Sequence, residues 1–213
     1  MKRIISIVVT VLLLATTVNA QNLKPIKLNA PNKERGSSIM KSLSERHSER
    51  EFSKEKLSLQ DLSDLLWAAN GINRADGRRT AATARNNQDI DLYAVMEEGS
   101  YLYDAKAHEL KPVAEGDHRP LIADRQVSIL DAPISLLIVS DLSRFTGADL
   151  ELQKQWGALD AGIVSQNIML FASGCGFVTV PRAFMKKDEL KKVLKLSETQ
   201  VPMLNNPVGY PKK

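Results

Sequence analysis

The apolar run between Pro133 and Ser140 constrains the fold of this chain more than any other stretch. Its residues Ile134–Val139 are almost all apolar, without the alternation of a strand that has one face in water. Such a run is typical of a β-strand buried on both faces. The sequence therefore predicts a sheet that is covered by other elements on both sides.

A second constraint is the long helix predicted over Asp149–Ser173. Its large apolar residues recur at helical spacing, and we expect them to form the stripe that faces the core. They are Trp156, Leu159, Ile163, Leu170 and Phe171. A neighbouring face carries only small residues, namely Gly157, Ala158, Ala161, Gly162 and Ser165. Small residues let another helix approach closely, and packing within the chain or across a dimer explains them equally well.

The remaining elements predict one α+β domain. Leu92–Glu97, Ser100–Asp104 and Glu109–Ala114 are separated by turn residues and form an antiparallel meander. Because Val201–Val208 contains two prolines, we expect any strand there to lie at a sheet edge. Helix caps are predicted at Ser37 or Ser38, at Ser58 and at Asp188. Trp67 is expected in the core and His108 and His118 in exposed loops without chemistry.

The N-terminus has the pattern of a secretory signal peptide over residues 1–20. Two cations precede an apolar run that is shorter than the roughly 20 residues of a membrane-spanning helix, so cleavage is favoured over an anchor. We expect an exported chain, periplasmic or secreted, with an extended arm or linker at 21–36 and a domain at 37–213. Removal of Lys2 and Arg3 lowers the formal net charge from +4 to +2. That balance argues against binding of nucleic acid or of an anionic membrane surface.

The charged stretch Arg46–Phe52 is the first candidate site. In an extended segment Arg46, Ser48 and Arg50 lie on the same side, with His47 between them. Two guanidinium groups and a hydroxyl are suited to a terminal phosphate and the polar chain attached to it. The alternative is a solvated, charge-rich turn.

The second candidate site is the stretch Gly77–Gln88, which is rich in small and polar residues. Small side chains allow a flat ligand to approach the backbone, and Asn86 and Gln88 offer donors and acceptors to the edge of a heterocycle. A polar loop before a strand is the alternative. No His or Cys grouping has metal-ligand spacing, and no nucleophile elbow or Walker loop is present. The sequence thus gives no support to a hydrolase or a kinase.

Together these stretches resemble the FMN-dependent nitroreductase family over roughly Ser37–Pro211. The resemblance rests on Arg-His-Ser-x-Arg from Arg46, Ala-Thr-Ala-x-Asn-x-Gln from Ala82, and Gly-Asp-x-Arg from Gly116. It extends to Trp156–Leu170 in the long helix and to Val-Gly-Tyr-Pro at the end of the chain. The Gly-Asp-x-Arg turn is most similar to the branch that contains thiazoline- and oxazoline-oxidising dehydrogenases.

The resemblance implies a nitroreductase-like fold, with a mostly antiparallel sheet flanked by helices, in an intertwined homodimer with FMN at the interface. The residues implied in FMN binding form three groups. They are Arg46, Ser48 and Arg50 at the phosphate with His47 nearby, then Ala82, Thr83, Ala84, Asn86 and Gln88 from the other subunit, and Pro181, Arg182 and Ala183 beside the ring. Ala82 replaces the family's usual proline, and Arg182-Ala183 stands where many members have Glu-Gly. A further basic contact would correspond to Lys212 or Lys213.

The implied activity is a ping-pong reduction, in which NADH or NADPH reduces the flavin and a nitroaromatic or quinone-type acceptor reoxidises it. The flavin carries the redox chemistry, so no side chain is expected to act as acid, base or nucleophile, and no metal is expected. Export conflicts with this activity, because NAD(P)H and FMN are scarce outside the cytoplasm. Two alternatives therefore stay open: a flavin dehydrogenase that oxidises an organic substrate, and a non-catalytic flavin-binding module.

Overall fold

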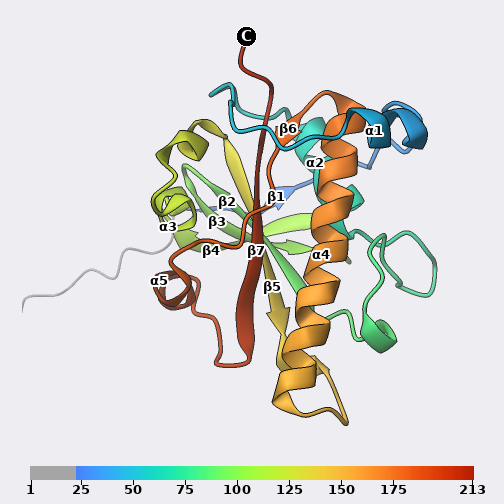
Figure 1. Ribbon diagram of the computed structural model, residues 1–213, viewed down its shortest axis with the longest axis vertical. Coiled ribbons are helices and arrows are strands. Elements are labelled where there is room, and N and C mark those ends of the chain that lie inside the picture. Colours follow the sequence, from blue (N-terminus) through green and yellow to red (C-terminus); the bar gives the residue numbers. More distant parts are fainter. Residues whose placement is uncertain (1–22) are drawn as a thin grey trace, which may run out of the picture.

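The computed structural model describes residues 23–213, and within this range the strands form one antiparallel sheet (Figure 1). The order of the strands is β1-β4-β3-β2-β5-β7-β6. Their bounds are Ile26–Lys27 (β1), Ile90–Met96 (β2), Gly99–Asp104 (β3), Glu109–Glu115 (β4), Ile134–Asp141 (β5), Val178–Thr179 (β6) and Gln200–Gly209 (β7). The predicted signal peptide, residues 1–20, lies outside the described residues.

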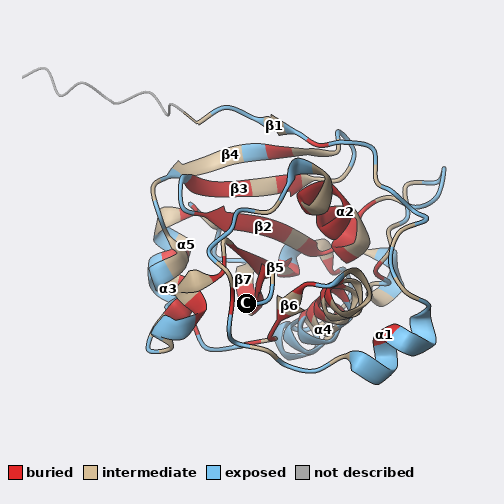
Figure 2. Cartoon of the chain, turned by 90° about the horizontal axis from the view of Figure 1, so that it is seen from above, coloured by how far each residue is buried: buried red, intermediate tan, exposed pale blue. Residues whose placement is uncertain are grey.

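Helices cover both faces of this sheet, which confirms the predicted α+β class (Figure 2). Helices α2 and α4 pack on one face, and α1 contacts α4. Helices α3 and α5 pack on the opposite face. Their bounds are Ile39–Glu45 (α1), Leu59–Asn70 (α2), Arg119–Ala123 (α3), Leu150–Cys175 (α4) and Lys187–Val193 (α5). Short 3-10 turns span Ala84–Asn86, Val127–Asp131 and Leu142–Arg144.

Strand β5 lies between β2 and β7 and is buried on both faces, as its apolar run predicts. Leu136 and Ile138 belong to the core under α2 and α4, whereas Leu137 and Val139 belong to the core under α3 and α5. Alternate side chains of a strand point to opposite faces, so one apolar run supplies both cores. The meander β2-β3-β4 also forms as predicted.

The prediction that the last strand lies at an edge is wrong. Strand β7 pairs with β5 along its length, and β6 pairs with Val208 and Gly209 on its other side. Because β6 is so short, β7 has no strand partner on that side at Pro202 within the described residues. A proline is tolerated where no ladder hydrogen bond is needed from its nitrogen.

The predicted core stripe of α4 is wrong for Leu159 and Ile163, whereas Trp156, Leu170 and Phe171 are partly buried. Leu159 is 61% exposed and Ile163 is 38% exposed, while Gly157, Ala161 and Ser165 of the face with small residues are buried. The cause is a close approach, because a Cβ added at Gly157 would lie 2.4 Å from Ser140 Oγ in β5. The buried residues of α4 are Gly157, Asp160, Ala161, Val164, Ser165, Ile168 and Ala172.

The helix caps follow the predictions at two of three positions. Ser38 accepts a hydrogen bond from Lys41 N, and Ser58 accepts one from Asp61 N. Asp188 is not a cap but lies in the first turn of α5, whose N-cap is Lys186. Carboxylates stabilise the first turn of a helix as well as its cap position, which explains why the pattern misled by one or two residues.

Both loop histidines are half-buried and hydrogen-bonded, which corrects the expectation that they are exposed. His108 Nδ1 lies 2.9 Å from Tyr103 Oη, and His118 Nδ1 lies 3.0 Å from Ser100 Oγ. Burial lowers the pKa of His118. Trp67 is likewise only partly buried and donates its Nε1–H to Ile72 O.

The segment before α1 lies against the domain. Residues Ile26–Lys27 pair with β4, and Arg35 forms ion pairs of 2.8 and 2.7 Å with Asp61 and Asp64 of α2. Across residues 23–213, no helix has the length and apolarity needed to cross a membrane. In the same range no three His, Cys, Asp or Glu side chains are grouped to hold a metal ion.

Candidate functional site

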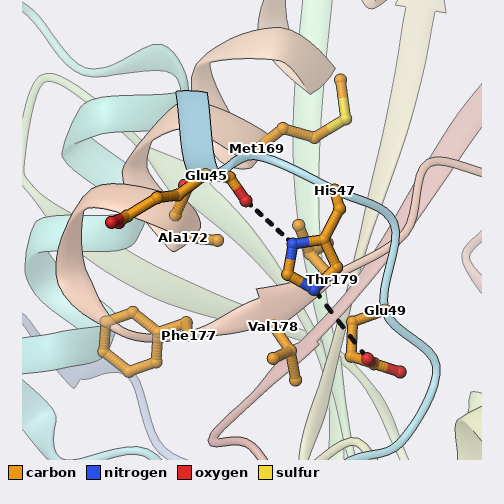
Figure 3. Close-up of a pocket in the computed structure, with 9 residues that line it drawn as sticks. Glu45, His47, Glu49, Met169, Ala172, Phe177, Val178 and Thr179 are labelled. Carbon is orange, nitrogen blue, oxygen red and sulfur yellow. Dashed lines mark hydrogen bonds and ion pairs between the residues drawn. The ribbon is translucent and has the colours of Figure 1, made fainter. Parts of the chain in front are cut away.

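The segment that follows α1 is extended and is fixed at both ends. Glu49 N donates to Thr179 O of β6 at 3.0 Å, and Phe52 is buried and forms a bridge with Pro211. His47 and Glu49 face a hollow of about 400 Å³ against β6 and the end of α4. Figure 3 shows the His47 ring between the Glu45 carbonyl oxygen, 2.8 Å from Nδ1, and the Glu49 carboxylate, 3.9 Å from Nε2.

The alternating side chains Arg46, Ser48 and Arg50 therefore project to the opposite side of this segment. Within residues 23–213, these three side chains have no hydrogen bond or ion pair. Glu49 lies beside Arg50, but its Oε1 accepts hydrogen bonds from the backbone N–H groups of Arg50 and Glu51 and not from the Arg50 guanidinium. These hydrogen bonds also hold the pKa of Glu49 below its ordinary value. Two guanidinium groups and a hydroxyl without internal partners are the donor set that a phosphate needs.

A second cavity, of about 480 Å³, lies around Arg182. It is lined by Asp124, Arg125, Gln126, Arg182 and Phe184, and its size is typical of small-molecule sites. Burial lowers the pKa of Arg182, and the positive charge of Arg50 lowers it further. Arg50 is therefore close enough to interact electrostatically with Arg182. Phe184 is 81% exposed and provides an aromatic surface at the edge of the cavity.

The Arg182 side chain is held inside the protein. Its guanidinium donates to Gln126 Oε1 at 2.9 Å and to Asn205 Oδ1 at 3.0 Å, and to the carbonyls of Ile122 and Ala123 at the end of α3. Its backbone exchanges hydrogen bonds with Asn205 at 2.8 and 2.7 Å. Arg182 is therefore a structural anchor that leaves Pro181 and the exposed Ala183 at the surface.

The end of the chain passes beside the same segment. Ser53 N donates to Tyr210 O at 2.9 Å, and the bridge between Phe52 and Pro211 follows directly. Lys212 and Lys213 come next and are exposed. Lys212 and Lys213 thus directly follow Pro211, which is paired with the segment that carries Arg46 and Arg50.

The second candidate segment forms a tight loop before β2. Arg85, Asn86 and Gln88 have φ values of 53°, 56° and 48°, a region that side chains other than glycine rarely adopt. Ala84 N donates to Asp160 Oδ2 of α4 at 2.8 Å, and the Arg85 guanidinium lies 5.0 Å from the centre of the Trp156 ring. The strained backbone is therefore held by contacts to α4.

Within this loop, Asn86 and Gln88 differ in what they can offer a ligand. Gln88 Nε2 donates to Gly77 O, and Gln88 Oε1 accepts from Arg79 Nε, both at 3.2 Å. Asn86 is exposed, and its side chain has no hydrogen-bond partner within residues 23–213. Ala82 is exposed and Thr83 is half-buried, with its Oγ1 accepting from Gln88 N. Asn86 is thus available to a ligand, whereas Gln88 stabilises the loop.

The structure brings the segment of Arg46, Ser48 and Arg50 close to residues 181–183. The loop that carries Asn86 and Gln88 lies elsewhere in the same chain. Ser173 Oγ donates to Ser42 O near the first group, whereas Ala84 of the loop contacts Asp160. Since α4 rises 1.5 Å per residue, the 13 positions between Asp160 and Ser173 separate these contacts by about 20 Å. Within one chain, the two candidate segments therefore contact α4 at well-separated positions.

Sequence reasoning assigned no role to Asp160, which contacts the loop. Asp160 lies on the same helix face as Gly157, Ala161 and Val164, and this face packs on the sheet. A charged residue on a buried face is rare unless it has a partner. A carboxylate on the buried face of α4 could therefore have pointed to Asp160. It was overlooked because a different face of α4 was assigned to the core from the sequence.

Comparison with known proteins identifies the family. Residues 43–210 of this chain match the sequence model of the nitroreductase family. The chain belongs to the nitroreductase family. A relative from Methanocaldococcus jannaschii, provisionally named a nitroreductase, is 30% identical, with 78% of this chain and 88% of that protein covered. Membership of this family places the chain among the oxidoreductases.

Solved structures agree with this family. A crystal structure of a provisionally assigned nitroreductase from Ralstonia eutropha has a TM-score of 0.80 and 30% identity, covering 89% of this chain and 90% of that one. A structure from Staphylococcus epidermidis, provisionally named an NAD(P)H:FMN oxidoreductase, has a TM-score of 0.63. It is 14% identical, covers 86% of this chain and 92% of that one, and supports the fold alone.

Proposed function

We propose that this nitroreductase-family chain binds FMN and uses NADH or NADPH to reduce nitroaromatic or quinone-type acceptors by two electrons. The observation that carries the proposal is the set of unpaired donors Arg46, Ser48 and Arg50 on one segment, with Arg50 in electrostatic reach of Arg182, which lines a cavity. A phosphate would satisfy donors that the described part of the protein leaves without partners. The name of the Staphylococcus epidermidis protein, which includes FMN and NAD(P)H, agrees with this choice.

The residues fit FMN in distinct ways. Arg46, Ser48 and Arg50 hold the phosphate and the sugar-like chain, and the free carboxamide of Asn86 contacts the heterocycle from a second subunit. Pro181 and Ala183 line the ring through their backbone, because the Arg182 side chain is used inside the protein. When bound, FMN supplies the two-electron redox chemistry. The protein contributes binding, orientation and positive charge at the phosphate.

Donor and acceptor use the same open cavity in turn, so the chain needs no separate nicotinamide site. Phe184 provides an apolar wall at its edge. No side chain at this place is required as an acid, base or nucleophile. The same chemistry would operate in an exported protein, which we propose from the N-terminal signal, provided that FMN is acquired before or after export.

We further propose that two chains form a homodimer that completes each site. Helix α4 exposes Leu159 and Ile163, which are spaced for one helix face. Helix α1 adds Ile39, Met40 and Leu43, which are 59%, 71% and 48% exposed (Figure 2). Apolar residues gathered on a surface mark association sites. A second chain would cover these apolar residues and would bring its own Asn86 loop to Arg46 and Arg50 of the first chain. Within one chain, the Asn86 loop and the segment of the arginines lie at well-separated positions along α4.

The phosphate assignment is tested with Arg46→Ala. Loss of one charge-assisted hydrogen bond should weaken FMN binding by about 1.5–3 kcal/mol, or about 10–150-fold, measured by fluorescence titration of the apoprotein. Lys106→Ala, which removes the same charge from an exposed turn, is the matched control and should bind FMN normally. Equal affinity of Arg46→Ala and the control would contradict the assignment.

The shared site is tested by mixing two variants that each weaken FMN binding. Suppose that each site takes Arg46 from one chain and Asn86 from the other. A dimer of one Arg46→Ala chain and one Asn86→Ala chain then has one site with both substitutions and one intact site. Flavin binding should then recover to about half of the wild-type capacity. A site contained within one chain leaves no intact site, so absence of recovery in dimers that have exchanged subunits would contradict the proposal. Leu159→Glu should prevent dimer formation in sedimentation analysis, whereas Val127→Glu, at an exposed apolar residue elsewhere, should not.

A further inference from the structure

Two carboxyl groups meet inside the protein beneath the loop that carries Asn86. Asp89 directly precedes β2 and is 0% exposed, and Asp160 lies in the middle of α4 and is 3% exposed. Asp89 Oδ2 accepts a hydrogen bond of 2.6 Å from Ser140 Oγ, and Asp160 Oδ2 accepts the bond of 2.8 Å from Ala84 N. The second oxygen of Asp89, Oδ1, is buried and has no donor among residues 23–213.

A proton on Asp89 accounts for this buried oxygen. The carboxyl group that faces Asp89 is that of Asp160, and two ionised carboxylates cannot form a hydrogen bond with each other. If Asp89 is protonated, it can donate to Asp160 and keep its bond from Ser140. Burial, followed by the neighbouring Asp160, raises the pKa of Asp89 to about 7, so that its neutral form persists far above the ordinary pH range of an aspartate.

Other charged groups near the pair have partners of their own. Arg144, from the turn Leu142–Arg144, is the cation that approaches Asp89. Its guanidinium is engaged by Asp91 at 2.7 Å and by Asp141 at 3.3 Å. Arg85, from the loop itself, stacks on the Trp156 ring of α4. Neither arginine forms an ion pair with Asp89 or Asp160 within the described residues, so the shared proton is what reduces the charge of the pair.

Asp160 attaches the backbone of the loop to α4. The bond from Ala84 N to Asp160 is the one hydrogen bond between residues 82–88 and α4 in the part of the chain that the structure describes. Other hydrogen bonds of residues 82–88 are internal, as between Asn86 N and Thr83 O, or join segments outside α4, as between Arg144 Nη1 and Gln88 O at 2.8 Å. Since three residues of the loop have positive φ, the conformation persists only where surrounding contacts hold it.

We propose that Asp160 is a positioning residue that holds the loop so that it presents Asn86, and that Asp89 supports it by donating a shared proton. The role of Asn86 rests on the proposed FMN site, but the attachment itself does not. Loss of the proton places two negative charges side by side in a buried place, and their repulsion displaces Asp160 from Ala84. Loop attachment therefore weakens as the pH rises through about 7.

The test measures amide hydrogen exchange at Ala84 in the flavin-free protein, from acidic to alkaline pH. The observed rate is divided by the intrinsic rate at each pH, and the amide of Ile138 in β5 serves as an internal reference. In the wild type, the protection of Ala84 should fall at least about tenfold across the titration, the change that corresponds to one pKa unit of coupling. Asp89→Asn should keep full protection at alkaline pH, because a carboxamide can donate to Asp160 and accept from Ser140 without titrating.

Two variants of Asp160 separate positioning from general stability. Asp160→Ala should leave Ala84 unprotected at every pH, whereas Asp160→Asn, which retains an acceptor, should restore most of the protection. Wild-type protection that is independent of pH, or an Asp160→Ala variant with a normally protected Ala84, would overturn the inference. The measurement needs no cofactor. A protein that shows the predicted exchange but binds no FMN would contradict the proposed function and leave this inference standing.

Discussion

Replacement of Asp89 by asparagine should make the protein more stable at alkaline pH. The folded-state pKa of Asp89 is raised from its ordinary value of 3.8 to about 7. Between these two values the folded protein binds more protons than the unfolded chain, so the free energy of unfolding decreases as the pH rises. One pKa unit corresponds to about 1.4 kcal/mol, and the raised pKa therefore costs the wild type up to about 4 kcal/mol above pH 7.

Asp89→Asn removes this cost because the carboxamide does not ionise. The variant and the wild type should have similar stability near pH 4, and the difference should grow to a few kcal/mol near pH 8. Urea unfolding at a series of pH values measures it, provided that the dependence on urea concentration is the same for both proteins. Asp188→Asn, at an exposed carboxylate of α5, should follow the wild-type curve. Parallel curves for Asp89→Asn and the wild type would refute a protonated Asp89.

Two further predictions concern the packing around the site. Gly157→Ala places a Cβ 2.4 Å from Ser140 Oγ and should lower the free energy of unfolding by about 1–3 kcal/mol, whereas Gly162→Ala, with open space around its Cβ, should not lower it. Arg182→Met leaves two carbonyl groups of α3 and Asn205 Oδ1 without donors and should cost about 3 kcal/mol or more. Arg125→Met, at an exposed arginine of the same cavity, should have little effect on urea unfolding. Equal stability within either pair would contradict the packing described here.

Local patterns predicted much of this fold. Ser38 and Ser58 begin helices because their hydroxyls accept backbone N–H groups two or three residues ahead, which depends on neighbouring residues alone. The run Ile134–Val139 predicts burial on both faces for the same reason. The face of α4 could not be assigned in this way. Leu159 and Ile163 form an apolar stripe as regular as the buried one, and only the close approach of Gly157 to β5 decides between the two.

The candidate site was predictable to a similar extent. Alternation along the chain places Arg46, Ser48 and Arg50 on one side, and the structure adds that these side chains are unpaired within the described residues. The role of Arg182 was not predictable, because its partners come from α3 and β7, which are distant in sequence. Asp160 was hidden for the same reason, since its contact with Ala84 joins residues 76 positions apart.

The most direct test of the proposed function is the absorbance spectrum of the purified protein after reconstitution with FMN, before and after anaerobic addition of NADH or NADPH. We expect a protein-bound flavin band that bleaches with one of the nicotinamides and returns with a nitroaromatic or quinone-type acceptor. A bound band that bleaches only with an organic substrate would indicate a substrate-oxidising dehydrogenase, and a band that no donor bleaches would indicate a binding module. Absence of any bound flavin would contradict the FMN site on which the proposed function depends.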